Sequence, residues 1–136
     1  MNFDARTLAV PVWLPRLLAI AAVAEGVTGL ALLLDPSVVA TMLLQSRVDA
    51  TGVVIGRLAG AGLLSLGIAC WCARRTASAP ASVGVAWALL VYNVAACVTL
   101  AGAAAAMAGG GLPALGVSVP HGGFAAALLV ALLRRS

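Results

Sequence analysis

The chain has 136 residues, of which 63% are hydrophobic and only 9% charged, and its mean hydropathy is +1.13. Soluble domains carry roughly 25% charged residues, so this chain has too few polar groups to cover a water-exposed surface and is expected to lie in a lipid bilayer. The formal net charge of +4 includes eight arginines, six of which flank apolar segments. Because these arginines are scattered, the charge does not indicate a nucleic-acid partner, and none is expected.

Four apolar segments are long enough to cross the hydrocarbon core, which takes about 20 helical residues at a rise of 1.5 Å each. They span approximately residues 14–34, 53–73, 81–107 and 113–133. The first segment contains Ala22-Val23-Ala24, which imitates a signal-peptide cleavage site. Its apolar character continues to Leu34, so we interpret it as an uncleaved first helix. The sequence thus predicts an all-α fold, a single integral membrane domain built as a bundle of four transmembrane helices.

The loop after the first segment carries apolar residues at helical spacing, namely Val38, Val39, Met42 and Leu43. Pro36 stands where proline is favoured in a first helical turn. One interpretation of this loop is a short helix lying on the outer membrane surface. An irregular loop is the other.

The fourth segment is interrupted near its middle by Pro120, which is followed by His121 and two glycines. Only the 12 residues from Gly122 to Leu133 are uninterrupted, which is too short to cross a membrane. Either the helix begins at Pro113 and kinks at Pro120, or its outer half is irregular and shielded by protein. We favour the kinked helix.

Arginine placement predicts the topology. Six arginines lie before the first span, between the second and third, or after the fourth: Arg6, Arg16, Arg74, Arg75, Arg134 and Arg135. Four spans bring these three regions to one side of the membrane, and the opposite loops hold only Arg47, with Asp35 and Asp49 against it. The positive-inside rule then places both termini in the cytoplasm. Trp13, Trp71 and Trp87 fall at the same predicted interface. We expect a multi-pass protein of the inner (plasma) membrane.

Glycines in the second span predict close helix packing. Gly52, Gly56 and Gly60 form a double G-x-x-x-G pattern, and Gly67 extends the same face. Such glycines let another helix approach closely. The partner is either another helix of the chain, which we favour, or a second copy in a homo-oligomer. Glycines of the first helix offer a matching surface.

Five polar residues inside the spans are the candidate site: Glu25, Arg57, Tyr92, Asn93 and His121. An ionisable group at membrane depth costs about 2.5 to 3.5 kcal/mol on insertion scales, so such groups tend to face inward and pair. Glu25 is expected about 13 Å below the outer end of the first helix, and His121 about 12 Å below the start of the fourth. Arg57 starts about 6 Å below the outer end of its helix, and its side chain is long enough to point down toward Glu25.

These depths predict one inward cluster of Glu25, Arg57, Asn93 and His121, with Tyr92 beside it. One interpretation is structural: a Glu25–Arg57 ion pair holds two helices in register, and the other residues join helices by hydrogen bonds. The other interpretation, which we favour, is a functional pocket that opens to the outer leaflet or the outer aqueous side. For Arg57 alone, extension of its side chain to the outer interface is a further alternative.

The order of several residues resembles that in the small four-helix DoxX-like bacterial membrane proteins, most of which have no assigned activity. The residues that carry this resemblance are Glu25-Gly26, Gly29, Leu32-Leu33, Pro36, Gly56-Arg57, Gly60, Tyr92-Asn93 and His121. The resemblance covers nearly the whole chain and implies a small four-helix protein of a bacterial membrane. Some family members are subunits linked to quinone or thiosulfate oxidation. This sequence shows no quinone or redox motif that would carry such an activity over.

Three classes of function follow from the sequence. The first, which we favour, is a small binding or accessory protein, with the polar cluster as its site and a membrane protein as a potential partner. The second is a proton-coupled transporter of small molecules that uses Glu25, although a paired Arg57 would neutralise the carboxylate that transport needs. The third is a haem or redox subunit, for which one histidine per chain requires a second ligand from elsewhere.

An enzyme is the weakest interpretation, since Glu25 and His121 have no accompanying nucleophile, metal ligands or phosphate-binding loop. The three cysteines, Cys70, Cys72 and Cys97, all lie in apolar segments, and the C-x-C pair points to different faces of a helix. A disulfide framework or a zinc site is therefore not expected. No cofactor is expected.

Overall fold

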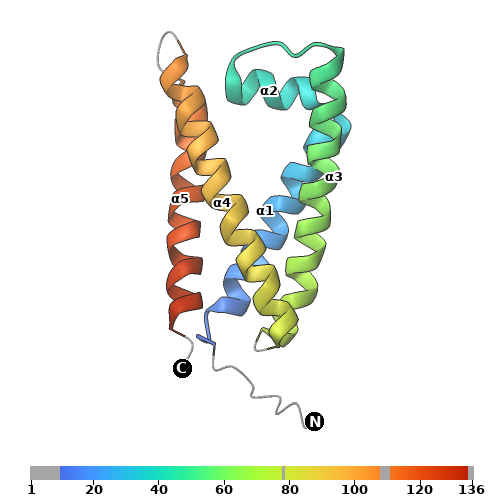
Figure 1. Ribbon diagram of the computed structural model, residues 1–136. Helices are drawn as coiled ribbons and strands as arrows, with labels where there is room; N and C mark the ends of the chain where they lie inside the picture. Colours follow the sequence, from blue (N-terminus) through green and yellow to red (C-terminus); the bar gives the residue numbers. More distant parts are fainter. Residues whose placement is uncertain (1–9, 78, 108–110, 135–136) are drawn as a thin grey trace.

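A computed structural model describes residues 10–77, 79–107 and 111–134 of the chain (Figure 1). Every regular element in these residues is helical. The elements are α1 (Leu14–Leu34), α2 (Pro36–Leu44), α3 (Ala50–Ala73), the 3-10 helix η1 (Arg74–Thr76), α4 (Pro80–Ala106) and α5 (Leu112–Leu133). Helices α1, α4 and α5, and the run from Ala50 to Thr76, are each long and apolar enough to cross a membrane. The all-α fold with four candidate spans is therefore confirmed.

The helix ends follow from local capping. The Asp35 side chain accepts hydrogen bonds from the backbone N–H groups of Ser37 (3.0 Å) and Val38 (3.1 Å), which starts α2 immediately after α1 ends. Pro36 occupies the first turn of α2, where its missing N–H costs nothing. Asp49 caps α3 in the same way, accepting from Gly52 N–H at 2.7 Å, so α3 begins three residues earlier than hydropathy alone predicted. The first loop is thus a short helix between two carboxylate-capped turns.

Helix α5 is continuous from Leu112 to Leu133, with Pro120 inside it. The helical interpretation of this segment is therefore confirmed over the irregular one. Proline has no N–H to donate to the carbonyl four residues earlier, here that of Gly116. Both Gly116 and Pro120 are exposed. The interruption in the sequence pattern thus does not end the helix.

The long helices form two pairs. Helix α1 packs along α3, and α4 packs along α5. The pairs meet at the end of the molecule where both termini lie, and they diverge toward the other end, where α2 crosses between them (Figure 1). Helix α2 contacts α5 as well as α1 and α3, so it bridges the pairs at their open end.

Glycines bring α1 and α3 into backbone contact. A Cβ added at Gly60 would lie 2.7 Å from the Gly29 carbonyl oxygen, and one added at Gly67 would lie 2.9 Å from the Gly26 nitrogen. Gly56 instead faces Pro36, at the start of α2, at 2.6 Å. The glycine face of α3 is therefore used within the chain. Gly52 is different, since its nearest neighbours are Val48 and Asp49 of the turn just before it.

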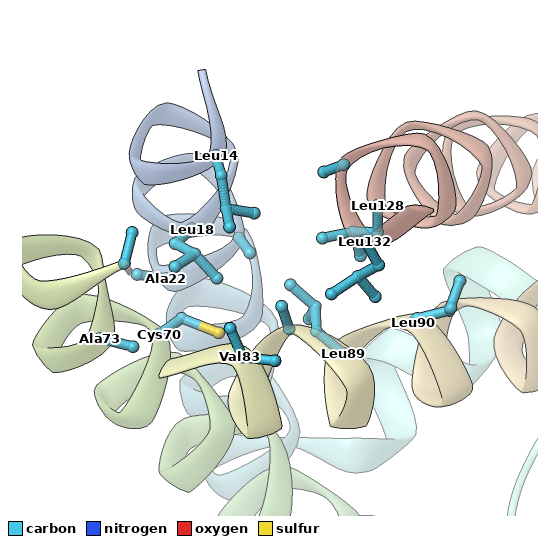
Figure 2. Packing of buried hydrophobic residues seen from close by; sticks show 14 of the residues in the cluster. Leu14, Leu18, Ala22, Cys70, Ala73, Val83, Leu89, Leu90, Leu128 and Leu132 are labelled. Atoms are coloured by element: carbon cyan, nitrogen blue, oxygen red, sulfur yellow. The ribbon is translucent and has the colours of Figure 1, made fainter. Parts of the chain in front are cut away.

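The apolar core fills the end where the two pairs meet. Leu14 and Leu18 of α1 point toward Leu89 of α4 and toward Leu128 and Leu132 of α5, and Ala22, Cys70 and Ala73 lie on the α3 side (Figure 2). Leu14, Leu18, Leu89 and Leu128 are fully buried. The core extends outward along α1 to Ala22, along α4 to Leu90 and along α5 to Ala125. Beyond that level, the pairs are no longer held together by packed leucines.

Candidate ligand cavity and its polar floor

The polar residues of three helices lie at one level, one turn beyond the apolar core. Glu25 follows the core residue Ala22 by three positions, Asn93 follows Leu89 by four, and His121 precedes Ala125 by four. Three or four residues make one helical turn. The fold therefore places a polar layer directly on top of the leucine core, where the two helix pairs begin to separate.

Two hydrogen bonds fix the orientation of Asn93 and His121. The Asn93 Nδ2 group donates to the Leu89 carbonyl oxygen at 2.9 Å, and Asn93 Oδ1 lies 2.8 Å from His121 Nδ1. Because the Leu89 carbonyl can only accept, the Asn93 amide group must present its oxygen to the imidazole, and Nδ1 must donate. A neutral His121 then has its proton on Nδ1 and an acceptor lone pair on Nε2.

Tyr92 connects the hydrogen-bonded Asn93 and His121 to the helix pair formed by α1 and α3. Its ring packs edge-on against the His121 ring, with centroids 5.7 Å apart and an interplanar angle of 83°. Its hydroxyl lies close enough to the Glu25 carboxyl group for the two to interact. Tyr92 and Asn93 are neighbours on α4, about 100° apart around the helix, so one faces α1 while the other faces α5. The polar layer thus runs across the molecule from α1 through α4 to α5.

A cavity of about 760 Å³ extends from this layer toward α2, and Ile20, Ala21 and Phe124 border it on the side of the core. Glu25, Tyr92, Asn93 and His121 all border it and form what is called here the polar floor. The walls come from α1, α3, α4 and α5 and are mostly apolar, with Thr28 and Thr99 as the remaining hydroxyl groups. Of the five candidate residues, the structure brings these four together in one lining.

Helix α2 forms the roof of the cavity. Pro36, Val39, Ala40, Leu43 and Leu44 border the space. Val38 and Met42 point away from it and are 52% and 72% exposed. The short helix therefore presents one apolar face to the cavity and another to the surroundings. A short helix was one of the two interpretations that the sequence allowed for this loop, and neither placed the inward face of α2 in a site with Glu25.

Arg57 does not join the polar floor. It is exposed on α3 and does not border the cavity, and no ion pair to Glu25 occurs among the described residues. The reason is its position around the helix. Gly56 and Gly60 face α2 and α1, and Arg57 is rotated by about 100° from Gly56, away from the flank where Ile55 borders the cavity. The expected Glu25–Arg57 pair is thus corrected, and the exposed position suits a side chain that extends toward the membrane surface.

The electrostatic character of the cavity follows from this arrangement. Among the described residues that border it, Glu25 is the one acidic side chain, and none is arginine or lysine. Glu25 is only 5% exposed. Within the described chain, the other acidic residues and all arginines except the half-buried Arg74 are exposed. Arg74 stacks on Trp71, 3.5 Å from the ring centroid, and does not border the cavity.

The described residues contain no group of three His, Cys, Asp or Glu side chains that could hold a metal ion. Comparisons with models of known protein families, with curated proteins and with solved structures gave no match. The site consists of a hydrogen-bonded floor with one carboxyl group and one oriented imidazole, under an apolar chamber.

Proposed function

We propose that this chain is a small polytopic inner-membrane protein that binds an amphipathic small molecule, either alone or as an accessory subunit of a larger complex. The observation that supports this most directly is the combination of an apolar chamber of about 760 Å³ with a polar floor from three helices. Small-molecule sites commonly have volumes of about 300–1,000 Å³, with apolar walls and a few placed polar groups. The ligand would put its apolar body under α2 and its polar head on the floor.

The arrangement is more than a means of holding helices in register. Polar residues that serve only as interhelical contacts can be enclosed by packed side chains, as the leucine core encloses its own members. Here the four floor residues border open space, and His121 Nε2 has no hydrogen-bond partner among the described residues. His121 borders the chamber, and an acceptor that no described residue uses is what a ligand-binding site requires.

Arginine placement supports an outward-facing cavity. Arg16, Arg74, Arg75 and Arg134 belong to the end of the molecule where the termini lie, whereas α2 lies at the other end (Figure 1). Helix α2 borders the cavity. With the positive-inside rule, we propose an N-in/C-in topology and a cavity in the outer half of the bilayer. Membership of the DoxX-like proteins remains a proposal that rests on the residue pattern.

Filling the cavity tests the proposed function. Ala96 borders the chamber one turn above Asn93, whereas Val98 on the same helix is 67% exposed and does not border it. The probe is a tritiated naphthylbutyl amine, and its binding is measured to protein in lipid nanodiscs. It should bind saturably to the wild type and to Val98→Trp, but not to Ala96→Trp. Protein-free nanodiscs correct for partitioning into lipid. Equal binding by the two tryptophan variants would contradict a site in the cavity.

A proton-coupled transporter is a second candidate, because the Glu25 carboxyl group is not paired with Arg57 and borders the cavity. Protonation and ligand binding can compete at such a group, which is how a membrane carboxylate couples the two. This alternative predicts ligand flux driven by a pH gradient in proteoliposomes, lost in Glu25→Gln. Saturable binding without any flux in the wild type would leave binding as the function and remove transport.

A further inference from the structure

We infer that the ligand's head group is a hydrogen-bond-donating cation, so that the preferred ligand is a lipophilic amine in its ammonium form. This inference rests on the proposed function and names the ligand class for the same cavity. It is carried by the pairing of one buried carboxyl group with one oriented imidazole acceptor on a floor whose described residues offer no cation.

The charges that border the cavity favour a cationic head group. Glu25 is 5% exposed and borders the cavity, and buried carboxylates are stable in proteins when a cation or a proton neutralises them. Arg57 is exposed elsewhere on α3, and no described residue that lines the cavity is arginine or lysine. The cationic partner that the chain does not provide here can come from the ligand. An anionic head would face an unpaired carboxyl group in an apolar chamber, which disfavours it strongly.

The direction of the hydrogen bonds on the polar floor favours a head group that donates. The bond from His121 Nδ1 to Asn93 Oδ1 leaves Nε2 as an acceptor in the neutral imidazole. The Asn93 amide group cannot turn without placing its oxygen against the Leu89 carbonyl, to which its nitrogen donates at 2.9 Å. Nε2 and the Glu25 carboxylate are then two acceptors on one floor, and an ammonium group carries several N–H donors. A head that donates to both is held better than one that carries only charge.

The surface around these acceptors suits an amine with an apolar body. The aromatic rings of Tyr92 and Phe124 both border the cavity, and aromatic faces attract cations. The rest of the lining is mainly Ala, Val, Leu and Ile from five helices, which suits an apolar body and contributes binding free energy through burial. The site thus combines an electrostatically negative floor with apolar walls.

A series of ligands with one body tests this inference on the unaltered protein. The heads are primary ammonium, trimethylammonium, hydroxyl and carboxylate, each on the same naphthylbutyl body, with binding measured in neutral-lipid nanodiscs and corrected with protein-free discs. The primary ammonium ligand should bind about tenfold more tightly than the alcohol, and more tightly than the trimethylammonium ligand, which cannot donate. The carboxylate should bind most weakly.

Two variants test whether the preference for ammonium over alcohol depends on Glu25. Glu25→Gln keeps the side-chain shape and should reduce the ammonium-over-alcohol preference by about tenfold. Asp49→Asn removes the same formal charge at the cap of α3, outside the cavity, and asparagine caps helices as well as aspartate does. It should leave the preference unchanged.

The outcomes separate the two proposals. Saturable binding in the cavity with equal affinity for ammonium and alcohol, or with the carboxylate preferred, overturns the ligand class and leaves the proposed function standing. Absence of saturable binding for all four ligands overturns both. If Glu25→Gln does not fold, the ligand series on the wild-type protein still decides the question.

Discussion

Substitution of Gly60 by alanine is expected to destabilise the fold through a defined backbone contact. The added Cβ would lie 2.7 Å from the Gly29 carbonyl oxygen and 2.9 Å from both Leu33 N and Leu32 Cβ. Ordinary contacts begin at about 3.4 Å, so α1 and α3 must separate by about 0.7 Å at this point to relieve the closest contact. The neighbouring atoms are mostly backbone and cannot rotate away. Overpacking of this kind costs about 1–3 kcal/mol.

The same helix offers a matched control. Gly62 has nothing within 4 Å of an added Cβ, and alanine is favoured over glycine in a helix by about 0.8–1 kcal/mol in soluble hosts. Gly62→Ala should therefore be neutral or stabilising, whereas Gly60→Ala should lower the free energy of unfolding. Reversible unfolding in mixed micelles, followed by circular dichroism, measures both. Equal effects of the two substitutions, or a stabilising Gly60→Ala, would refute the close packing of α1 on α3.

Three further predictions concern capping, the polar floor and Arg57. Asp35→Ala should cost about 1 kcal/mol because two N–H groups lose their acceptor, while Asp35→Asn should keep most of that stability. Faster amide exchange at the start of α2 in the alanine variant alone would show the effect. Nitrogen-15 NMR should find the His121 proton on Nδ1 in the neutral wild type. Asn93→Leu should abolish that tautomer preference and cost about 1–3 kcal/mol, since the Nδ1 donor loses its acceptor; a wild-type proton on Nε2 would contradict the assigned network. Arg57→Gln should change stability by no more than about 0.5 kcal/mol and leave ligand affinity unchanged, because Arg57 is exposed and does not reach Glu25. A large loss of stability or of ligand affinity would instead support an ion pair between Arg57 and Glu25.

The helices of this fold could be predicted well because their signals are local. Hydropathy predicted a first span over Leu14–Leu34, which is the observed extent of α1. The predicted ends of the other three spans lie within three residues of the ends of α3, α4 and α5. The short helix α2 was one of two interpretations of its segment, suggested by Pro36 and the apolar spacing after it, and the structure has the helix. Capping by Asp49 explains the earlier start of α3. In a membrane, backbone groups must be satisfied within each segment, so length and composition define a helix without knowledge of its neighbours.

The depth of the site residues along their helices could be predicted from the sequence, but the direction in which each side chain points around its helix could not. Counting turns from the helix ends placed Glu25 and His121 at similar depths and Asn93 somewhat deeper, and in the structure all three residues border one cavity. Counting did not give the angular position of Arg57, because a G-x-x-x-G face can meet a neighbour on either flank. Asn93 and His121 are 28 residues apart in the sequence. The hydrogen bond between them depends on how α4 packs against α5, and the residue pattern of a single helix does not predict that packing.

The cavity itself has no signature in the sequence. It exists because the packed leucine core stops one turn below the polar floor, because the two helix pairs then diverge, and because α2 crosses above them (Figure 1). Each of these is a property of helix crossing rather than of any one residue. The inward face of α2 joins the site only through that geometry.

Photoaffinity labelling tests the central claim, a ligand bound in this cavity, most directly. A naphthylbutyl amine that carries a diazirine would be activated on the protein in nanodiscs, and the labelled residues would be mapped by mass spectrometry. Adjacent residues give the contrast: Thr28 and Thr99 border the cavity, while Val27 and Val98 do not and are 65% and 67% exposed. The account predicts labelling of the two threonines that excess unlabelled amine suppresses. Labelling mainly at the two valines, unaffected by the competitor, would contradict it.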